Sequence, residues 1–408
     1  MIGKRKLAIL LGDGMADYPI ESLGGKTPLE AARTPNMDYI AQKGITGMVK
    51  TIPHGMLPGS DTANLSVFGY NPEVYYTGRA PLEAINMGID FGPDDAAFRC
   101  NIVNLNNNIM EDFSAGHIDS EFSKIVIKGL SEKINHRDLK LYPGVSYRNI
   151  LIWHNYPYKD ITETIPPHDI QDKDIDDYLP RGEGSDVLMK LMEQSKKTIA
   201  KSEEIKSAGA KYKGKPNSIW LWGGGKKPTM DSMEKRFGLN GYTISAVDLI
   251  NGIGKSIGLI PLHVEGATGY IDTNYTGKGK ALLDALKDSN FVFLHVESPD
   301  ESGHEGNLEH KIKSIEDFDE KVVGQVLKGM DVFEDCTVIV LSDHPTPISI
   351  RTHTSDPVPF SIYRNKNFDN SPYIDMKASS YCEREAEKTG LFVKEGHRLI
   401  ELMINGKL

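Results

Sequence analysis

The chain has 408 residues, of which 39% are hydrophobic, so it is long enough for two or three domains with a large core. Its formal net charge of −10 disfavours binding to a nucleic-acid backbone or an anionic membrane surface. The cysteines are widely spaced and form no CxxC pair, which favours a reduced, cytoplasmic protein without disulfide bonds; they are Cys100, Cys336 and Cys382.

The N-terminal segment predicts a βαβ-like opening. A short apolar run at residues 7–11 ends at Asp13 and is typical of a buried strand, being too short for a signal peptide or a membrane span. Helix starts follow at residues 27–30, which form a capping box, and at residues 34–44, where a Thr-Pro pair precedes apolar residues at helical spacing. The segment at residues 45–52 completes the unit.

The heptapeptide PGSDTAN, at residues 58–64, stands where a further helix is predicted to begin. Ser60 and Asp61 are ordinary helix N-caps, and the preceding Pro-Gly pair is an ordinary turn. The alternative is that Ser60 is a nucleophile, because a metal ion and a helix N-terminus both favour loss of the hydroxyl proton. The heptapeptide alone favours the cap, and the nucleophile becomes the better interpretation only if metal ligands lie nearby.

The middle of the chain is predicted to be a smaller α+β domain inserted into a larger α/β domain. Residues 92–183 are rich in Asn, Asp and Pro and contain short strand patterns with one helix, whereas residues 1–91 and 184–408 alternate buried strands with helices. Two later strands, at residues 291–296 and 338–341, repeat the pattern of the first one. The fold class we expect is therefore α/β, with a large sheet built from both flanking segments.

One long amphipathic helix is predicted between these two later strands. From residue 312 to residue 330, apolar side chains recur at steps of three and four.

Each of the three predicted strands is followed by an aspartate, and histidines follow two of them. In an open α/β sheet, ligands bind beyond the carboxyl ends of the strands. Carboxylate and imidazole groups suit a cation such as Mn²⁺ or Zn²⁺. A surface role is the alternative for each histidine, and we favour it for His310. Six side chains exceed the needs of one ion and predict two metal ions: Asp13, Asp300, His304, Asp343, His344 and His353.

Several motifs spread over essentially the whole chain resemble one family. They are GDGMAD, TPNMDYIAQKG, PGSDTANLSVFGY, TGRAPLEAINMGI, SPDESGHEG, LSDHPTP and RTHTSDPVPF. These motifs are similar to those of the archaeal-type cofactor-independent (2,3-bisphosphoglycerate-independent) phosphoglycerate mutases of the alkaline phosphatase superfamily. The resemblance implies an alkaline-phosphatase-like metal-binding domain, with a mostly parallel sheet, formed by residues 1–91 and 184–408. It implies an inserted substrate-binding, or mutase, domain at residues 92–183.

The resemblance also implies roles for individual residues. Asp300, His304 and His353 match the ligands of one metal ion; the other set comprises Asp13, Asp343, His344 and the nucleophile Ser60. The implied cofactors are two divalent cations, Mn²⁺ with Zn²⁺, Mg²⁺ or Co²⁺ as alternatives, and no 2,3-bisphosphoglycerate.

Substrate contacts are implied within the insert. His117 matches a histidine that contacts the substrate phosphate, and Asp119 is a candidate acid/base group. Arg148 and Arg181 are candidates for binding a carboxylate or phosphate, since a guanidinium fork suits both.

The implied reaction interconverts 3-phosphoglycerate and 2-phosphoglycerate, in glycolysis and gluconeogenesis, through a phosphoserine at Ser60. The partner is then a small phosphorylated substrate, with neither nucleic acid nor membrane. Two alternatives stay open. Segments such as IWLWGGGKKP and DTNYTGKG resemble a bacterial branch whose members are proposed homoserine kinases, and a metal-dependent phosphatase would use the same metal ligands.

Overall fold

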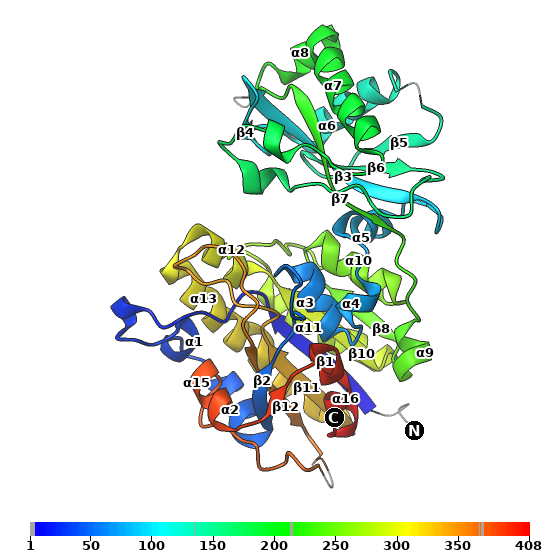
Figure 1. The fold of residues 1–408 in the computed structure, drawn as a ribbon. Coiled ribbons are helices and arrows are strands. Elements are labelled where there is room, and N and C mark those ends of the chain that lie inside the picture. Colours follow the sequence, from blue (N-terminus) through cyan, green and yellow to red (C-terminus); the bar gives the residue numbers. More distant parts are fainter. Residues whose placement is uncertain (1–4, 135, 213–214, 367, 369–370) are drawn as a thin grey trace. The chain divides into compact units, whose positions relative to one another are not determined.

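The computed structural model describes residues 5–134, 136–212, 215–366, 368 and 371–408, and it divides into two compact units. Unit 1 joins Met1–Tyr76 to Met230–Leu408, and unit 2 is Thr77–Thr229. Figure 1 labels many of the helices and strands of both units. Unit 2 contains the segment 92–183 and also elements on either side of it, so a domain boundary at residues 91 and 183 stays a prediction.

Unit 1 is built on one eight-stranded sheet. Its strand order is β13-β2-β12-β11-β1-β10-β8-β9. The strands are β1 (Arg5–Gly12), β2 (Ile45–Val49), β8 (Gly241–Ile244), β9 (Ile260–Pro261), β10 (Phe291–Val296), β11 (Asp335–Leu341), β12 (Val358–Arg364) and β13 (Phe392–Val393). Most neighbouring pairs are parallel, and β12 is antiparallel to both of its neighbours. This architecture confirms the predicted α/β class.

The three apolar runs of the sequence are the three central strands of this sheet. β1 lies between β10 and β11 and is parallel to both, with Leu11 paired to His295 on one side and to Leu341 on the other. Because the register is level, the three strands end at the same edge. The residues that follow them, including Asp13, Glu297 and Ser342, therefore start from neighbouring positions.

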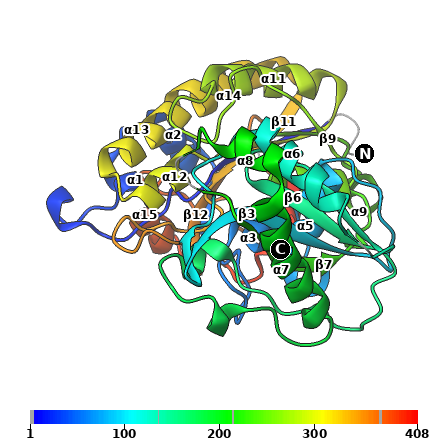
Figure 2. The ribbon, with the colours of Figure 1, turned by 90° about the horizontal axis from the view of Figure 1, so that it is seen from above.

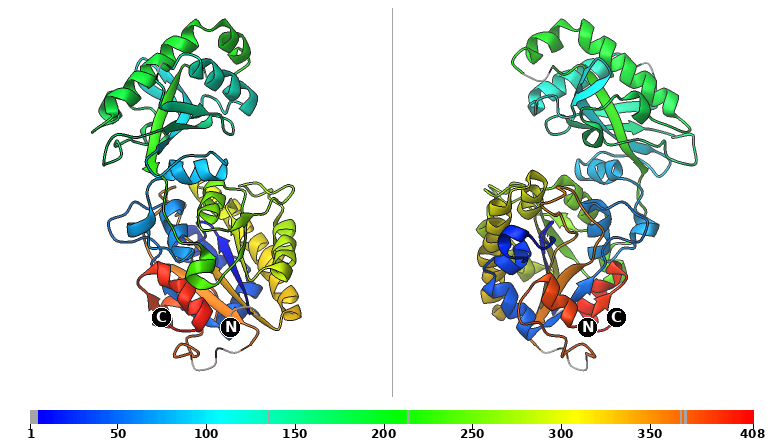
Figure 3. Two further views of the ribbon diagram at one scale, coloured as in Figure 1. Left: turned by 90° about the vertical axis from the view of Figure 1, so that its right-hand side faces the viewer. Right: turned by 60° about the vertical axis from the view of Figure 1, so that its left-hand side comes forward.

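Helices cover both faces of the sheet. Figure 2 shows α2, α11, α13 and α14 along one side of unit 1, where their apolar side chains share a core with β1, β10 and β11. In Figure 3 the yellow helices lie on one side of the sheet and the red C-terminal helix α16 on the other. On that second side, the Phe68 ring beyond α3 stacks on Phe293 of β10 at 4.0 Å.

The helical segments of unit 1 are mostly short. They are η1 (Glu21–Leu23), α1 (Pro28–Ala31), α2 (Pro35–Lys43), α3 (Ser60–Val67), α4 (Pro72–Tyr75), α9 (Met233–Phe237), α10 (Asp248–Ser256), α11 (Tyr275–Asp288), α12 (Ser298–Glu305), α13 (Leu308–Phe318), η4 (Asp319–Val323), α14 (Gly324–Gly329), η5 (Met330–Val332), α15 (Glu383–Lys388), η6 (Gly396–Arg398) and α16 (Leu399–Asn405). Among the described residues, no helix has both the length and the apolar character that crossing a membrane requires.

The N-termini of α1 and α2 are capped in different ways, one by neighbouring residues and the other by a residue distant in the sequence. The capping box predicted before α1 is present: Glu30 N–H donates to the Thr27 hydroxyl, and Thr27 N–H donates to the Glu30 carboxylate. The start of α2 is capped instead by Asp319, whose carboxylate accepts from Asn36 N–H at 3.1 Å and from Met37 N–H at 2.7 Å. Asp319 opens η4, a π-helical turn that separates α13 from α14. The helix predicted from residue 312 to residue 330 is therefore present, with a π-helical turn in its middle.

Unit 2 is an antiparallel α+β layer. Its sheet has the order β4-β3-β6-β5, with β7 paired to β3, and α6 and α7 share its core. The strands are β3 (Ala96–Asn106), β4 (Ile109–Asp112), β5 (Leu139–Tyr142), β6 (Arg148–Trp153) and β7 (Ser218–Lys226). The helical segments are α5 (Arg79–Asn86), α6 (Ser120–Ser131), η2 (Pro167–Ile170), η3 (Asp176–Tyr178), α7 (Ser185–Lys201) and α8 (Glu203–Gly209). Because β7 pairs with β3 over residues 96–103, unit 2 continues well beyond residue 183.

Candidate metal centre

The first group of predicted ligands gathers at the start of α12. Asp300 and His304 lie one helical turn apart, and the His304 Nε2 to Asp300 Oδ2 distance is 3.1 Å. His353, from the loop after β11, brings its Nε2 to 2.9 Å from the same His304 nitrogen and to 3.4 Å from Asp300 Oδ1. The second His304 nitrogen, Nδ1, lies 3.0 Å from the Arg351 carbonyl oxygen. A proton on Nδ1 would bond this carbonyl and leave the Nε2 lone pair for a cation.

The second group lies at the ends of β1 and β11. His344 Nε2 is 3.1 Å from Ser60 Oγ, 3.3 Å from Asp343 Oδ2 and 3.6 Å from Asp13 Oδ1. Ligand atoms of Asp13, Asp300 and His344 also fall within 4.8 Å of one another. The His344 and His353 rings are 4.1 Å apart between centroids. The structure therefore brings all seven predicted side chains of unit 1 into one cluster.

The Ser60 hydroxyl faces this cluster and does not cap α3. Ser60 is the first residue of the helix, Gly59 holds the N-cap position, and no side chain makes a cap hydrogen bond there. Asn64, one turn further on, donates to the Ser60 carbonyl oxygen and to Asp343 Oδ2, both at 2.9 Å. The helix start and the end of β11 are thus tied together by one buried amide.

The cluster holds more buried negative charge than its own residues neutralise. Asp13, Asp300 and Asp343 have exposed fractions of 0%, 3% and 0%. Burial raises the pKa of Asp13 well above its ordinary value, and the nearby Asp343 and Asp300 carboxylates raise it further. Burial also lowers the pKa of His344, which disfavours an imidazolium there. Asp13 Oδ1 is buried without a hydrogen-bond partner among the described residues. This donor set fits divalent cations.

The imidazole protons compensate part of this charge around Asp300. Burial alone would raise the pKa of Asp300. The hydrogen bonds from His304 and His353 outweigh burial and hold this pKa well below its usual range. In the same pair, burial lowers the pKa of His304, but the hydrogen bond to Asp300 prevails and raises it to about 9. A metal ion at this position would have to displace that proton.

Three polar residues around the ligands were not predicted from the sequence. Asn64 belongs to the quoted heptapeptide but was assigned no role. Thr346 donates a short hydrogen bond from its hydroxyl to Asp300 Oδ1. His295 lies inside the apolar run of β10, and its Nε2 is 2.8 Å from Asp13 Oδ2. The only sequence signal for His295 was a polar residue within an otherwise apolar buried strand.

The predicted substrate residues all lie in unit 2, and the structure groups two of them. The His117 and Tyr147 rings lie nearly perpendicular, at 75°, with 6.0 Å between their centroids, and the Arg148 guanidinium lies 5.5 Å from the centre of the Tyr147 ring. Asp119 caps α6 by accepting from Phe122 N–H and pairs with Lys211 at 2.9 Å. Arg181 donates to the Asp177 carbonyl oxygen at 2.7 Å. Asp119 and Arg181 therefore already have local partners.

A cluster of arginines around the buried Arg99 of unit 2 was also missed. Arg99, within β3, pairs with Glu83 at 2.9 Å and lies 4.2 Å from the Trp222 ring centre. Arg79 pairs with the other Glu83 oxygen at 3.1 Å. Burial lowers the pKa of Arg99 to about 10, against the attraction of Glu83, and Arg79 and Arg148 lower it further. Guanidinium groups here outnumber carboxylates, which suits an additional anion.

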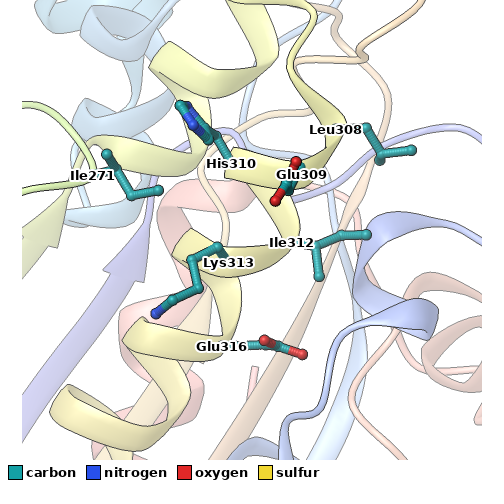
Figure 4. A pocket seen from close by; sticks show the side chains of 7 residues that line it. All are labelled: Ile271, Leu308, Glu309, His310, Ile312, Lys313 and Glu316. Atoms are coloured by element: carbon teal, nitrogen blue, oxygen red, sulfur yellow. The ribbon is translucent and has the colours of Figure 1, made fainter.

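A pocket of about 760 Å³ along α13 is a separate feature of unit 1. Figure 4 shows its lining of mixed apolar and charged side chains. It is lined by Ile271, Leu308, Glu309, His310, Ile312, Lys313 and Glu316, and none of the seven clustered side chains contributes to it. His310 Nδ1 lies 2.9 Å from the Tyr270 hydroxyl.

Comparison with known proteins gave consistent matches. A family model described as 2,3-bisphosphoglycerate-independent phosphoglycerate mutase matches residues 41–204. A relative from Methanosarcina mazei with this name is 49% identical over 98% of this chain and 99% of its own length. A Geobacter sulfurreducens relative, named "Probable 2,3-bisphosphoglycerate-independent phosphoglycerate mutase", is 47% identical over 98% of this chain and 100% of its own.

Solved structures match over almost the full length as well. The PH0037 protein from Pyrococcus horikoshii has a TM-score of 0.80 and 31% identity, over 98% of this chain and 97% of its own. A cofactor-independent phosphoglycerate mutase from Thermoplasma acidophilum has a TM-score of 0.64 and 22% identity, over 98% of both chains, and supports the fold alone.

Proposed function

Since the chain belongs to the family of 2,3-bisphosphoglycerate-independent phosphoglycerate mutases, we propose that it interconverts 3-phosphoglycerate and 2-phosphoglycerate. The enzyme is an isomerase that needs no 2,3-bisphosphoglycerate. The observation that carries the mechanism is the Ser60 hydroxyl, 3.1 Å from His344 Nε2 within the cluster of carboxylates and imidazoles. The names of the relatives do not favour the homoserine-kinase-like alternative.

The family assignment and the ligand groups of unit 1 support metal dependence, and we propose two ions. Asp300, His304 and His353 would hold one of them. Asp13, Asp343, His344 and Ser60 would hold the other, with Asp300 also within reach of Asp13 and His344. When bound, the cations would neutralise charge on the transferred phosphoryl group and favour ionisation of a hydroxyl. Mixed carboxylate and imidazole ligands suit Mn²⁺, with Zn²⁺, Mg²⁺ and Co²⁺ as alternatives.

The residues of α3 would carry the covalent chemistry. Ser60 Oγ loses its proton and forms a bond to phosphorus of 3-phosphoglycerate, the bond from phosphorus to the 3-oxygen breaks, and that oxygen takes up a proton as glycerate leaves. The 2-hydroxyl of glycerate then loses its proton and attacks the phosphoserine, and the Ser60 oxygen takes up a proton as its bond to phosphorus breaks. Asn64 would hold Ser60 in position relative to Asp343, because its amide donates to the Ser60 carbonyl oxygen and to the Asp343 carboxylate. Water must be excluded during this exchange, or the phosphoserine would hydrolyse.

Unit 2 would supply contacts to the anionic groups of the substrate. His117 and Arg148 both lie beside Tyr147, and the buried Arg99 and the partly exposed Arg79 add positive charge. Asp119 and Arg181 could bind substrate only by exchanging their present partners. A small phosphorylated substrate and a cytoplasmic location complete the proposal, the latter supported by three buried free cysteines.

Phosphorus NMR tests the reaction directly. The purified protein with Mn²⁺ and 3-phosphoglycerate, without 2,3-bisphosphoglycerate, should produce the 2-phosphoglycerate signal until equilibrium is reached. Release of inorganic phosphate as the main product would support a phosphatase instead. A parallel sample with homoserine and ATP should show no phosphohomoserine, and its appearance without mutase activity would overturn the assignment.

A further inference from the structure

His295 is a fully buried histidine beside the proposed metal ligands that the mechanism does not use. It lies near the end of β10 with an exposed fraction of 0%, and its Nε2 is 2.8 Å from Asp13 Oδ2. The sequence analysis assigned no function to His295. Its position next to a proposed ligand raises the question of whether it binds metal itself or orients Asp13.

The surroundings of His295 determine which ring nitrogen carries the proton. Val247 N–H donates to Ser245 Oγ at 3.0 Å, and Ser245 Oγ lies 3.1 Å from His295 Nδ1. The Ser245 hydroxyl can donate its own proton to Nδ1, and the ionised carboxylate of Asp13 beside Nε2 can only accept. In the neutral ring the proton then sits on Nε2 and is donated to Asp13 Oδ2. Both ring nitrogens are thus engaged, and neither presents a lone pair to a cation.

This arrangement divides the two oxygens of Asp13 between separate tasks. Oδ2 accepts the hydrogen bond from His295. Oδ1 has no hydrogen-bond partner among the described residues and lies 3.6 Å from His344 Nε2. A carboxylate that binds a metal commonly accepts such a hydrogen bond from a neighbouring residue that is not itself a ligand, and this bond fixes the orientation of the carboxylate.

A third cation, held by Asp13, His295 and Glu297, is the competing explanation. Ligand atoms of these residues lie within 4.8 Å of one another. However, the fully buried Lys278 donates from Nζ to the His295 carbonyl oxygen at 3.1 Å, and although burial lowers its pKa to about 8, the attraction of Glu297 acts in the opposite direction and favours the charged form. An ammonium group therefore already occupies the electrostatic role that a third cation would have here.

We propose that His295 is a positioning residue, which together with Ser245 holds Asp13 so that one carboxylate oxygen faces the metal, and that it is not a ligand. This inference rests on the proposed two-metal function. Its test is therefore metal binding, measured by calorimetry and by electron paramagnetic resonance of Mn²⁺, and not only the activity of the loaded enzyme.

The experiment compares two substitutions at this residue. In metal-free protein, His295→Leu should weaken Mn²⁺ binding at the site containing Asp13 by roughly 10- to 100-fold. His295→Gln, whose amide can replace the Nε2–H donor, should restore binding to within a few-fold of the wild type. Ser245→Ala should weaken it less, by roughly tenfold or less. His310→Leu is the matched control outside the cluster and should leave the affinity unchanged.

The outcomes separate this inference from the proposal on which it rests. Wild-type protein that binds no Mn²⁺ would overturn the two-metal function and the inference together. Two bound ions with unchanged affinity in His295→Leu would overturn the inference alone. Three ions in the wild type and two in His295→Leu would make His295 a ligand. If His295→Leu does not fold, unchanged affinity in Ser245→Ala together with an unchanged Mn²⁺ spectrum would be the contrary result.

Discussion

Replacement of Ser60 by alanine should separate catalysis from folding. The substitution removes one oxygen from the first residue of α3, where Gly59 holds the N-cap position and no side-chain cap bond exists. Since an N-cap side chain contributes about 1 kcal/mol when it does bond, the free energy of unfolding should change by less than about 1 kcal/mol. Loss of an obligatory nucleophile should lower turnover by roughly 10⁴-fold or more, which corresponds to about 5.4 kcal/mol in the activation free energy.

A coupled assay for 2-phosphoglycerate formation and urea unfolding of the same samples measure both quantities. Ser256→Ala is the matched control: Ser256 is also half-buried, it is the last residue of α10, and its hydroxyl donates to the Gly252 carbonyl oxygen. It should retain nearly normal turnover. Brief exposure of the wild type to labelled substrate should place the label on Ser60. A Ser60→Ala enzyme with more than about one tenth of wild-type turnover would refute the covalent relay.

Three further outcomes are expected. Removal of metal by a chelator should abolish activity, Mn²⁺ should restore it, and a fully active enzyme with at most one ion per chain would refute the two-metal site. Burial raises the pKa of Glu383 to about 7, so the folded state keeps a proton that the unfolded chain loses near pH 4.3. The free energy of unfolding should therefore fall as the pH rises from about 4.3 through 7, and urea unfolding of Glu383→Gln should show a flatter dependence; an identical profile would contradict the shift. Limited proteolysis should cut near Tyr76 and Thr229 before other sites, whereas first cuts near residues 91 and 183 would support the narrower insert.

The clustered ligands of unit 1 could be predicted because their signals are local. Buried parallel strands appear in a sequence as continuous apolar runs, and the polar residues directly after them come to one edge of the sheet. Asp13, Asp300 and Asp343 follow this rule, so three short segments were enough to expect that they meet. The capping box before α1 was predictable for the same reason, since all of its atoms belong to four consecutive residues.

The remaining features depend on partners that are distant in the chain. The role of His295 depends on Asp13, and the cap of α2 depends on Asp319, so neither can be seen in the neighbouring sequence. β7 joins unit 2 through its pairing with β3, which no periodicity of residues 218–226 reveals. Arg99 lies within β3 and its partner Glu83 lies on α5, so no local pattern connects the two residues.

The central position of β1 has a consequence for how the chain is made. Among the described strands of unit 1, β1 is synthesised first, and its two neighbours in the sheet begin much later in the chain, at Phe291 and Asp335. At about 5 to 20 residues per second, β1 therefore waits roughly 15 to 65 seconds for its second partner. Unit 2 needs no strand beyond β7 and can complete its own sheet during that interval. An apolar strand exposed for so long is a natural site for a chaperone to protect.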